Sequence, residues 1–475
     1  MTIGLVFPHQ CFDPEHIPKH WKSIRFIRHD IAYGGPYTTV STFHIARKVY
    51  FRAIEAAWID EMHKKKPQVK IEIIDRHKKW YTTDNCECWD PVDKMIEAEI
   101  KKHCKNTVIL DTPSFILTGE EAANIIKTGD KHAVFYAAIR RQTGILMTDT
   151  GKPEGGKWRY DTDNRNPVKK NTVLPNWKKE IDSRQSKYVE AAYNAVKKEK
   201  SLGEWTGQLI FPTTHDGAYD ALKRFVKQRL EHFGEYQDAI IKDDNPLFHS
   251  VLSGPLNSGL LTPQDVIDEA LKYKGKVSLS DLEGFVAQVI GWREFMRTVY
   301  VQSDGAPPKN RLKHNRVLGI QWYDGTTHLD PVDAAIARVN KWGYLHHIER
   351  LMVVGNAMFL CDIKPQEVYK WFMEMYIDSF DWVMYGNVYY MSQWLSNDIT
   401  TKPYISSSAY ILRMSDYKKG EWSAVWDALY WRQIGEHGDV LRKNYRMAAQ
   451  VAFWEKKTVS DKKLLLTTAA QYLKN

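Results

Sequence analysis

The chain has little of what usually identifies an enzyme or a secreted protein from its sequence. Its 475 residues contain five cysteines, too few for a disulfide framework. Cys86, Cys88 and Cys104 lie near His103, but this spacing does not match a standard zinc site, so we expect free thiols in a reducing compartment. No Walker loop, G-x-G-x-x-G fingerprint, G-x-S-x-G elbow or H-E-x-x-H pair occurs, which excludes the enzyme classes that those motifs identify.

Long apolar segments are missing as well. Residues 1–10 have no basic start followed by an apolar stretch, so they do not form a secretory signal. The most apolar run, residues 351–361, is too short to cross a bilayer. We therefore expect a soluble, intracellular protein, cytoplasmic or nuclear, without a membrane partner.

Aromatic side chains and positive charge are present in excess. The chain has 17 Trp, 25 Tyr and 17 Phe, and its 67 Lys and Arg exceed its 58 Asp and Glu by nine. Residues 401–475 contribute six of these charges, with 13 basic against 7 acidic side chains. Aromatic rings fill cores but also stack on bases and planar cofactors, and a basic region suits a polyanion. A solvated helical surface could have the same charge, so a nucleic-acid partner stays open.

The length predicts two or three structural units. In residues 1–130, short β-like runs at 3–7, 70–74 and 107–110 alternate with helical patterns such as 43–62. This alternation predicts an α/β domain with a parallel sheet.

The rest of the chain has a different pattern. Residues 131–205 include a stretch rich in Gly, Pro, Asp and Asn and are predicted to connect two domains. Residues 206–475 have helical periodicity, with predicted N-caps at Thr262, Ser280 and Asp330. We expect a large all-α domain there.

Two of the predicted helices carry residues suited to chemistry. The helix after residue 280 places four apolar side chains on one face and two arginines beside them: Phe285, Val289, Trp292 and Met296, then Arg293 and Arg297. Taken alone, this pattern favours a core helix with a solvated flank. His347 falls on the apolar face of a later helix, where desolvation lowers its pKa unless an anion lies nearby. A hydrogen-bonded core histidine is the alternative, and the pair of His346 and His347 is a poor metal site because the rings diverge.

An aromatic segment follows. The helix starting at Pro365 has a stripe of rings that is more often core than cofactor site. Residues 384–394 and 401–404 are predicted to be irregular, and their amides, aromatic rings and lysine suit bases and phosphates.

Several runs, taken in order, resemble the cryptochrome/photolyase family, and most of all its prokaryotic iron–sulfur (6-4) photolyases and related cryptochromes. They cover most of the chain: RRQTGILM, GGKWRYDTDNR, FGEYQDAI, HSVLSGPLNSGLL, GWREFMR, HHIERLMVVGN, NVYYMSQ, TKPY and RMSDY. The resemblance implies an N-terminal α/β parallel-sheet domain, followed by a large all-α domain that holds FAD. It also implies an antenna chromophore of unknown identity in the first domain, where His9 replaces an acidic contact.

The same resemblance assigns roles to individual residues. The cofactor-binding positions are His249, Ser250, Leu252, Ser253, Asn257, Arg293, Asp378, Met384 and Asn387. The electron-transfer positions are Trp371 and Phe372, with Trp322 or Tyr323. The catalytic histidine is His347, with His346 beside it, and the DNA and lesion contacts are Trp292, Met391, Lys402, Tyr404 and Arg413.

One departure from the branch is large. The four positions that match its cluster-ligating cysteines read Pro331, Lys418, Glu421 and Ala424. None can supply a thiolate, so we expect no iron–sulfur cluster and no other metal. Met384 also replaces the usual Asn or carboxylate that faces the flavin.

The resemblance implies a monomeric enzyme that repairs UV-damaged DNA with light and reduced FAD. A (6-4) photolyase is the first hypothesis. The alternatives are a cyclobutane pyrimidine dimer photolyase, a cryptochrome-like blue-light photosensor without repair activity, and a DNA-binding flavoprotein that has lost its chemistry.

Overall fold

The N-terminal part of the chain folds around a five-stranded parallel sheet. The computed structural model describes all residues except 1, 37, 77, 105, 128, 161–163, 244–245, 401–402 and 475. The strand order is β3-β2-β1-β4-β5. The strands are β1 (Ile3–Val6), β2 (Ser23–Ile27), β3 (Lys70–Ile74), β4 (Cys86–Trp89) and β5 (Thr107–Leu110).

The central position of β1 follows from its composition. Leu5 and Val6 are fully buried, as expected of an apolar strand with neighbours on both sides. The chain moves from β1 to β2 and β3 and then crosses back to β4, so the topology reverses between β1 and β4. The flanking helices are α1 (Asp30–Tyr33), α2 (Ile45–Lys65) and α3 (Lys94–His103). The expected α/β sheet domain is confirmed.

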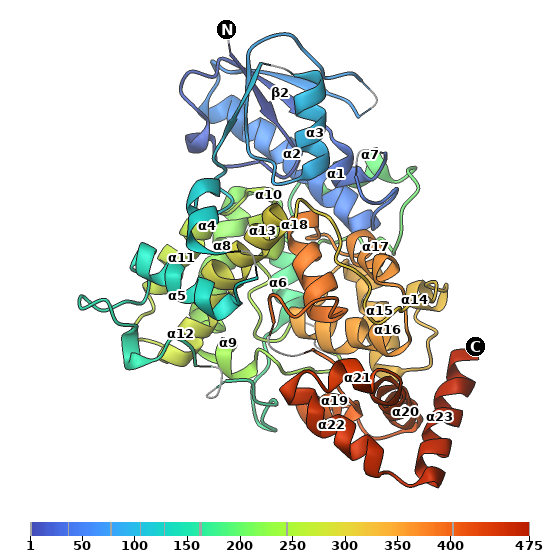
Figure 1. Cartoon of the computed structure of the whole chain (residues 1–475). Helices are drawn as coiled ribbons and strands as arrows, with labels where there is room; N and C mark the ends of the chain where they lie inside the picture. Colours follow the sequence, from blue (N-terminus) through green and yellow to red (C-terminus); the bar gives the residue numbers. More distant parts are fainter. Residues whose placement is uncertain are drawn as a thin grey trace.

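The remainder is helical and lies on one side of this unit, with α19–α23 at the far end (Figure 1). Its first helices are α4 (Gly119–Ile125), α5 (His132–Thr143), α6 (Trp177–Ser183), α7 (Tyr188–Val196), α8 (His215–Gln228), α9 (Leu230–Tyr236), α10 (Ser253–Ser258), α11 (Pro263–Leu271), α12 (Leu279–Val286) and α13 (Glu294–Gln302). The later ones are α14 (Gln321–Asp324), α15 (Asp330–Trp342), α16 (Asn356–Leu360), α17 (Pro365–Met375), α18 (Asp381–Met384), α19 (Ser408–Met414), α20 (Glu421–Glu436), α21 (Gly438–Leu441), α22 (Tyr445–Lys456) and α23 (Val459–Lys474).

Three π-helical segments interrupt this domain. They are η3 (Ala287–Arg293), η4 (Glu349–Gly355) and η5 (Tyr385–Ser392). A π-turn adds a residue to the helical turn and rotates the side chains that follow, and such turns are frequent at functional sites. The prediction of an irregular stretch at residues 384–394 is therefore wrong, because η5 continues α18.

Two helix starts also differ from the prediction. Ser278, not Ser280, caps α12, and its side chain accepts a hydrogen bond from the Asp281 amide. Leu329, not Asp330, precedes α15. The predicted cap at Thr262 is confirmed.

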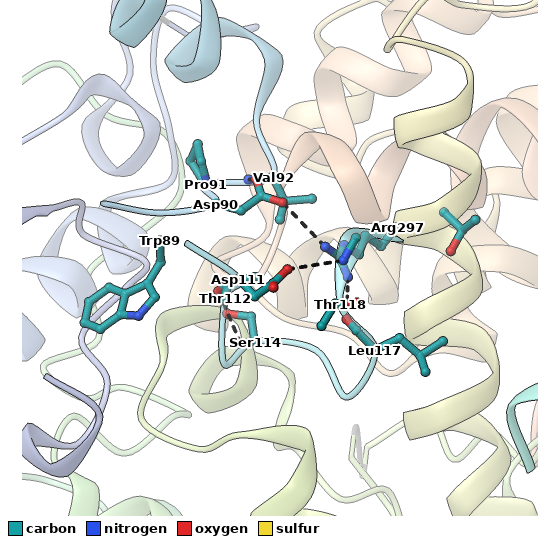
Figure 2. Close-up of polar contacts among 12 residues, drawn as sticks. Trp89, Asp90, Pro91, Val92, Asp111, Thr112, Ser114, Leu117, Thr118 and Arg297 are labelled. Atoms are coloured by element: carbon teal, nitrogen blue, oxygen red, sulfur yellow. Dashed lines mark hydrogen bonds and ion pairs between the residues drawn. The ribbon is translucent and has the colours of Figure 1, made fainter. Parts of the chain in front are cut away.

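Buried arginines join the sheet unit to the helical domain. The fully buried Arg47 of α2 donates to the carbonyl oxygens of Ile377 and Ser379, at 2.7 and 2.6 Å. Arg297 of α13 donates to the Leu117 carbonyl at 2.8 Å and pairs with Asp90 at 3.4 Å (Figure 2). The prediction of a solvated flank at Arg297 is wrong, because this flank is the contact between the two units.

The boundaries 1–130, 131–205 and 206–475 stay a prediction, although α5, α6 and α7 make the middle segment partly helical. All five cysteines are buried and unbridged. Among the described residues, no helix has the length and apolarity needed to span a bilayer.

Candidate active site

A cavity of about 330 Å³ lies inside the helical domain. Its walls come from the segment before and within α10, from α12 through α13, from the start of η4, and from α17 through η5. All three π-helical segments, η3, η4 and η5, therefore line it directly.

The cavity brings together most of the predicted site residues. From the predicted cofactor set, the lining includes His249, Ser250, Leu252, Ser253, Asn257, Arg293, Asp378, Met384 and Asn387. From the other sets, it includes His347, Trp292, Met391, Tyr404 and Phe372. Five predicted residues do not line it: His346, Trp371, Trp322, Tyr323 and Arg413. Lys402 lies outside the described residues.

Asp378 organises one wall of the cavity. Its carboxylate accepts two hydrogen bonds from Arg350, at 2.9 and 3.0 Å, and one from the Ser253 hydroxyl at 2.5 Å. Its backbone carbonyl accepts a hydrogen bond from the Asn257 side chain at 2.8 Å. Burial opposes the charge of Arg350, but Asp378 outweighs it and raises the pKa of Arg350. Arg350 therefore stays cationic inside the wall.

Arg293 is held by the protein on several sides. It donates to the Asn257 side chain, to the Leu256 carbonyl at 3.1 Å and to the Ser114 carbonyl at 3.2 Å. Its guanidinium also lies 4.7 Å from the ring centre of Trp382. Burial lowers the pKa of Arg293 to about 10, which leaves the group cationic at neutral pH. A fixed cation at the cavity wall suits an anionic or electron-rich ligand.

His347 is exposed to the cavity. The surrounding protein, with Arg350 and Arg165 nearby, lowers the pKa of His347 to about 4. The enclosing cavity walls and the positive charges of Arg350 and Arg165 all disfavour a proton on the imidazole. In the free protein, His347 is therefore neutral at pH 7.

His346 has a different place. It is buried, and its ring stacks on that of His249 with centroids 4.4 Å apart. Its Nε2 lies 3.2 Å from Glu349, which pairs with Arg338. Burial raises the pKa of Glu349 to about 7. His346 thus supports the cavity wall from behind and does not reach the cavity.

The predicted electron-transfer residues lie in neighbouring segments, and two of their rings, Trp371 and Phe372, are in contact. Phe372 lines the cavity, and its ring centre lies 5.5 Å from that of Trp371. The Trp371 indole donates to the Trp322 carbonyl at 2.7 Å. Next to Trp322, the Tyr323 hydroxyl donates to Glu374 at 2.7 Å. The group leads from the cavity wall to half-buried Tyr323.

Two cavity arginines were missed by the sequence reasoning. Arg165 lies at the end of the run GGKWRYDTDNR, and its backbone φ of 70° is uncommon for a residue with a side chain. Arg350 lies within HHIERLMVVGN. Both runs carry the family resemblance, but the sequence does not indicate which of their residues line the cavity.

The residues present fit a bound FAD. Fixed cations, hydroxyls and amides line the cavity together with apolar groups such as Leu351 and Val289. Within the described part of the chain, the buried Nε2 of His249 has no hydrogen-bond partner and can serve a ligand. The positions that hold cysteines in the iron–sulfur branch lie elsewhere, at α15 and near the start of α20, where Trp422 and Trp426 are buried. The expectation of no cluster, and the antenna near His9, stay predictions.

Family models match two parts of the chain. Residues 37–208 match the model described as deoxyribodipyrimidine photo-lyase-related protein. Residues 285–420 match the FAD binding domain of DNA photolyase. The second match includes Arg293, His347, Asp378, Met384 and Asn387 of the cavity wall.

Curated relatives and solved structures agree with these matches. A (6-4) photolyase of Agrobacterium fabrum is 34% identical over 357 residues, which are 72% of this chain and 69% of the relative. An uncharacterized protein of Acanthamoeba polyphaga mimivirus is 51% identical over 93 residues, 19% of this chain and 76% of that protein. A class III photolyase from Agrobacterium tumefaciens has a TM-score of 0.55 at 15% identity and covers 100% of this chain and 98% of its own. A Synechocystis cryptochrome has a TM-score of 0.57 at 12% identity, and the match covers 94% of this chain and 88% of the cryptochrome. The 34% identity to the Agrobacterium fabrum protein, together with the sheet unit and the helical FAD-binding domain, shows that the chain belongs to the photolyase/cryptochrome family.

Proposed function

We propose that the chain is a light-driven DNA-repair lyase, a (6-4) photolyase that acts as a monomer on UV-damaged DNA. The observation that carries this proposal is the presence in one cavity of His347, a set of stacking side chains and the cofactor-type wall around Asp378. The 34% identity to a protein named (6-4) photolyase supports the lesion preference.

FAD would be held by the wall of Asp378, Arg350, Arg293, Asn257 and Ser253. Reduced FAD, when bound and illuminated with blue light, supplies the electron that starts cleavage of the photoproduct. Met384 and Asn387 are proposed to line the flavin, with His249, Ser250 and Leu252 around the phosphates. The aromatic group of Trp371, Phe372, Trp322 and Tyr323 is proposed to deliver electrons toward the cavity.

The lesion, two joined pyrimidines of one strand, would enter the same cavity by flipping out of the duplex. Extruding damaged bases costs less than extruding stacked normal ones, which favours damaged sites. Trp292, Met391 and Tyr404 offer apolar faces, and Trp292 is held by stacking on His132 with ring centres 3.8 Å apart. Arg413, exposed on α19, is proposed to contact phosphate, as is Lys402.

His347 is the proposed acid. Its imidazole is neutral in the free protein because the surrounding protein and Arg350 lower its pKa to about 4. The phosphates of bound DNA would offset that effect and favour a proton on an imidazole nitrogen, which His347 then passes to the lesion. His346 is proposed to position the wall behind His249.

Light-dependent repair of two defined lesions tests the proposal. The full chain, reconstituted with FAD and reduced, is illuminated with a duplex that carries one (6-4) photoproduct or one cyclobutane dimer. We expect reversion of the (6-4) photoproduct in blue light and none in the dark. Repair of the dimer alone would favour the second photolyase class, and flavin binding without repair of either lesion would favour a photosensor.

A further inference from the structure

Three residues from separate segments meet beside the C-terminal end of α20, outside the cavity. His314 lies in the loop before α14, Asp362 follows α16, and His437 is the first residue after α20. The Nε2 of His314 is 3.4 Å from a carboxylate oxygen of Asp362, and the rings of His314 and His437 are 5.4 Å apart. One nitrogen or oxygen of each residue lies within 4.8 Å of the other two.

Neighbouring groups fix the orientation of these side chains. Arg432 donates to Oδ2 of Asp362 at 2.7 Å and leaves the other oxygen directed toward His314. Gln433 is fully buried, donates to Asp362 Oδ1 and to the Phe359 carbonyl, and places its own oxygen 3.2 Å from His314 Nε2. Metal-binding carboxylates in proteins are typically supported by such hydrogen bonds, as Asp362 is here. On binding a cation, His314 Nε2 gives up its hydrogen bond to Gln433 and the ring proton moves to Nδ1. A carboxylate oxygen has two lone pairs, so Oδ1 can accept from Gln433 and still bind a cation.

The local charge leaves room for a cation. Arg432 is shared between Asp362 and Glu436, the latter at 3.0 Å, so one positive group faces two carboxylates. The ring of His437 makes no hydrogen bond to any described residue. Two imidazoles and one carboxylate are a donor set that suits Zn²⁺ and related divalent transition metals. Asp362 and His437 are half-buried, so an ion can enter and water can complete its coordination.

A second group of histidine and carboxylate side chains is not suited to bind a metal ion. Asp13, Glu61 and His215 also lie close together, but the Lys65 ammonium is 3.2 Å from Asp13 and 2.7 Å from Glu61. His215 uses both ring nitrogens, toward Glu61 at 2.5 Å and the Cys11 carbonyl at 3.0 Å. Lys65 therefore takes the place that a metal would need.

We infer that His314, Asp362 and His437 bind one divalent transition-metal ion, for which Zn²⁺ is the best-suited candidate. The ion joins the loop before α14, the end of α16 and the end of α20, and so ties the C-terminal helices to the domain that contains the cavity. This inference departs from the sequence-based prediction that the chain binds no metal. It lies at the opposite end of α20 from Lys418, Glu421 and Ala424, the positions of the missing cluster cysteines.

Zinc stoichiometry of the untagged full chain tests this inference. Protein stripped with a chelator is dialysed against micromolar zinc chloride and then against buffer, and bound zinc is measured by atomic emission. We expect one zinc per wild-type chain, one in Glu61→Gln, and none in His437→Asn or His437→Gln. We also expect zinc to raise the Tm of the wild type by a few degrees and that of the His437 variants not at all.

Several results would overturn it. These are a wild-type chain without zinc, His437 variants that keep it, or loss of zinc from Glu61→Gln. The wild-type stoichiometry is decisive even if the variants fold poorly.

Discussion

Asp378 connects three other residues of the candidate site. Its side chain binds Arg350 and Ser253, and its carbonyl binds Asn257. The Arg350 side chain is only 12% exposed, so its charge depends on this partner. Removing one member of a buried pair leaves an uncompensated charge, which costs more than the pair itself contributes.

Asp378→Ala should therefore lower the free energy of unfolding by about 3–5 kcal/mol and reduce FAD retention after gel filtration. Asp378→Asn keeps part of the hydrogen bonding, so its unfolding free energy and FAD retention should lie between those of the wild type and of Asp378→Ala. Asp439→Ala, at an exposed acid on α21, is the matched control. A wild-type Tm and full flavin content in Asp378→Ala would contradict the role given to this residue.

Trp371 is the ring behind the cavity residue Phe372 in the proposed electron route. Trp371→Phe should slow blue-light reduction of the bound flavin at least about tenfold, because phenylalanine is not oxidised under these conditions and the electron would then have to cross two phenylalanine rings instead of Phe372 alone. Repair by chemically reduced protein should stay normal, since that assay bypasses the route. Trp431→Phe, in α20, serves as control, and equal photoreduction rates for both variants would exclude this route.

At the scale of elements, the segment from α12 through η3 to α13 contacts both the cavity and the sheet unit. Trp292 and Arg293 face the cavity, Arg297 reaches the sheet unit, and Glu294 accepts a hydrogen bond from the Ile116 amide at 2.8 Å. The π-turn of η3 lies between α12 and α13, within the stretch that supplies these contacts. A movement of the sheet unit would therefore shift Trp292 and Arg293 in the cavity wall.

Glu294 gives this segment a testable pH dependence. Burial raises its pKa to about 7, against the lowering effects of the Ile116 amide and the two nearby arginines. The neutral carboxyl stabilises the fold fully below pH about 4.5, and this contribution is lost as the pH rises through about 7. Glutamine mimics the neutral form at every pH.

As the pH rises from 5 to 8, the unfolding free energy of Glu294→Gln should therefore increase relative to that of the wild type, by up to about 3 kcal/mol. The measurement is the difference in unfolding free energy at the two pH values. Exposed Glu120→Gln should give a difference that does not change with pH. The same flat result for Glu294→Gln would show that this carboxyl is charged in the folded protein.

For the whole molecule, the sequence predicted the two-part architecture but not all of its elements. Strands β3 and β5 were predicted at their observed bounds, whereas β2 and β4 were missed. β4 reads Cys-Glu-Cys-Trp, which is too short and too polar in pattern to indicate a central strand. The π-helical segments could not be predicted, since they depend on packing around the cavity.

The site was predicted mainly through the family resemblance. Composition and periodicity alone favoured a core helix around Trp292 and Met296, and a solvated flank at Arg297. The cavity lining and the buried contact of Arg297 arise from segments more than a hundred residues apart, which no local pattern reveals. His346 was grouped with His347 because they are adjacent, yet a helix start directs them to different sides.

The net charge of +9 leads to a prediction about DNA binding. If lysines and arginines such as Arg413 neutralise phosphates, affinity should fall by at least about 100-fold between 50 and 200 mM salt. Titration of a labelled lesion duplex at several salt concentrations measures this slope. Arg413→Gln should reduce the slope by about one, and a slope near zero would contradict binding through phosphates.

The most direct test of the whole account is the rate of blue-light (6-4) repair per bound flavin in His347→Ala compared with wild type. Loss of a positioned acid should lower this rate at least about 100-fold, while flavin content and Tm stay close to those of the wild type. Repair within a few-fold of wild type by a fully flavin-loaded His347→Ala protein would contradict the assignment of His347 and, with it, the proposed (6-4) photolyase.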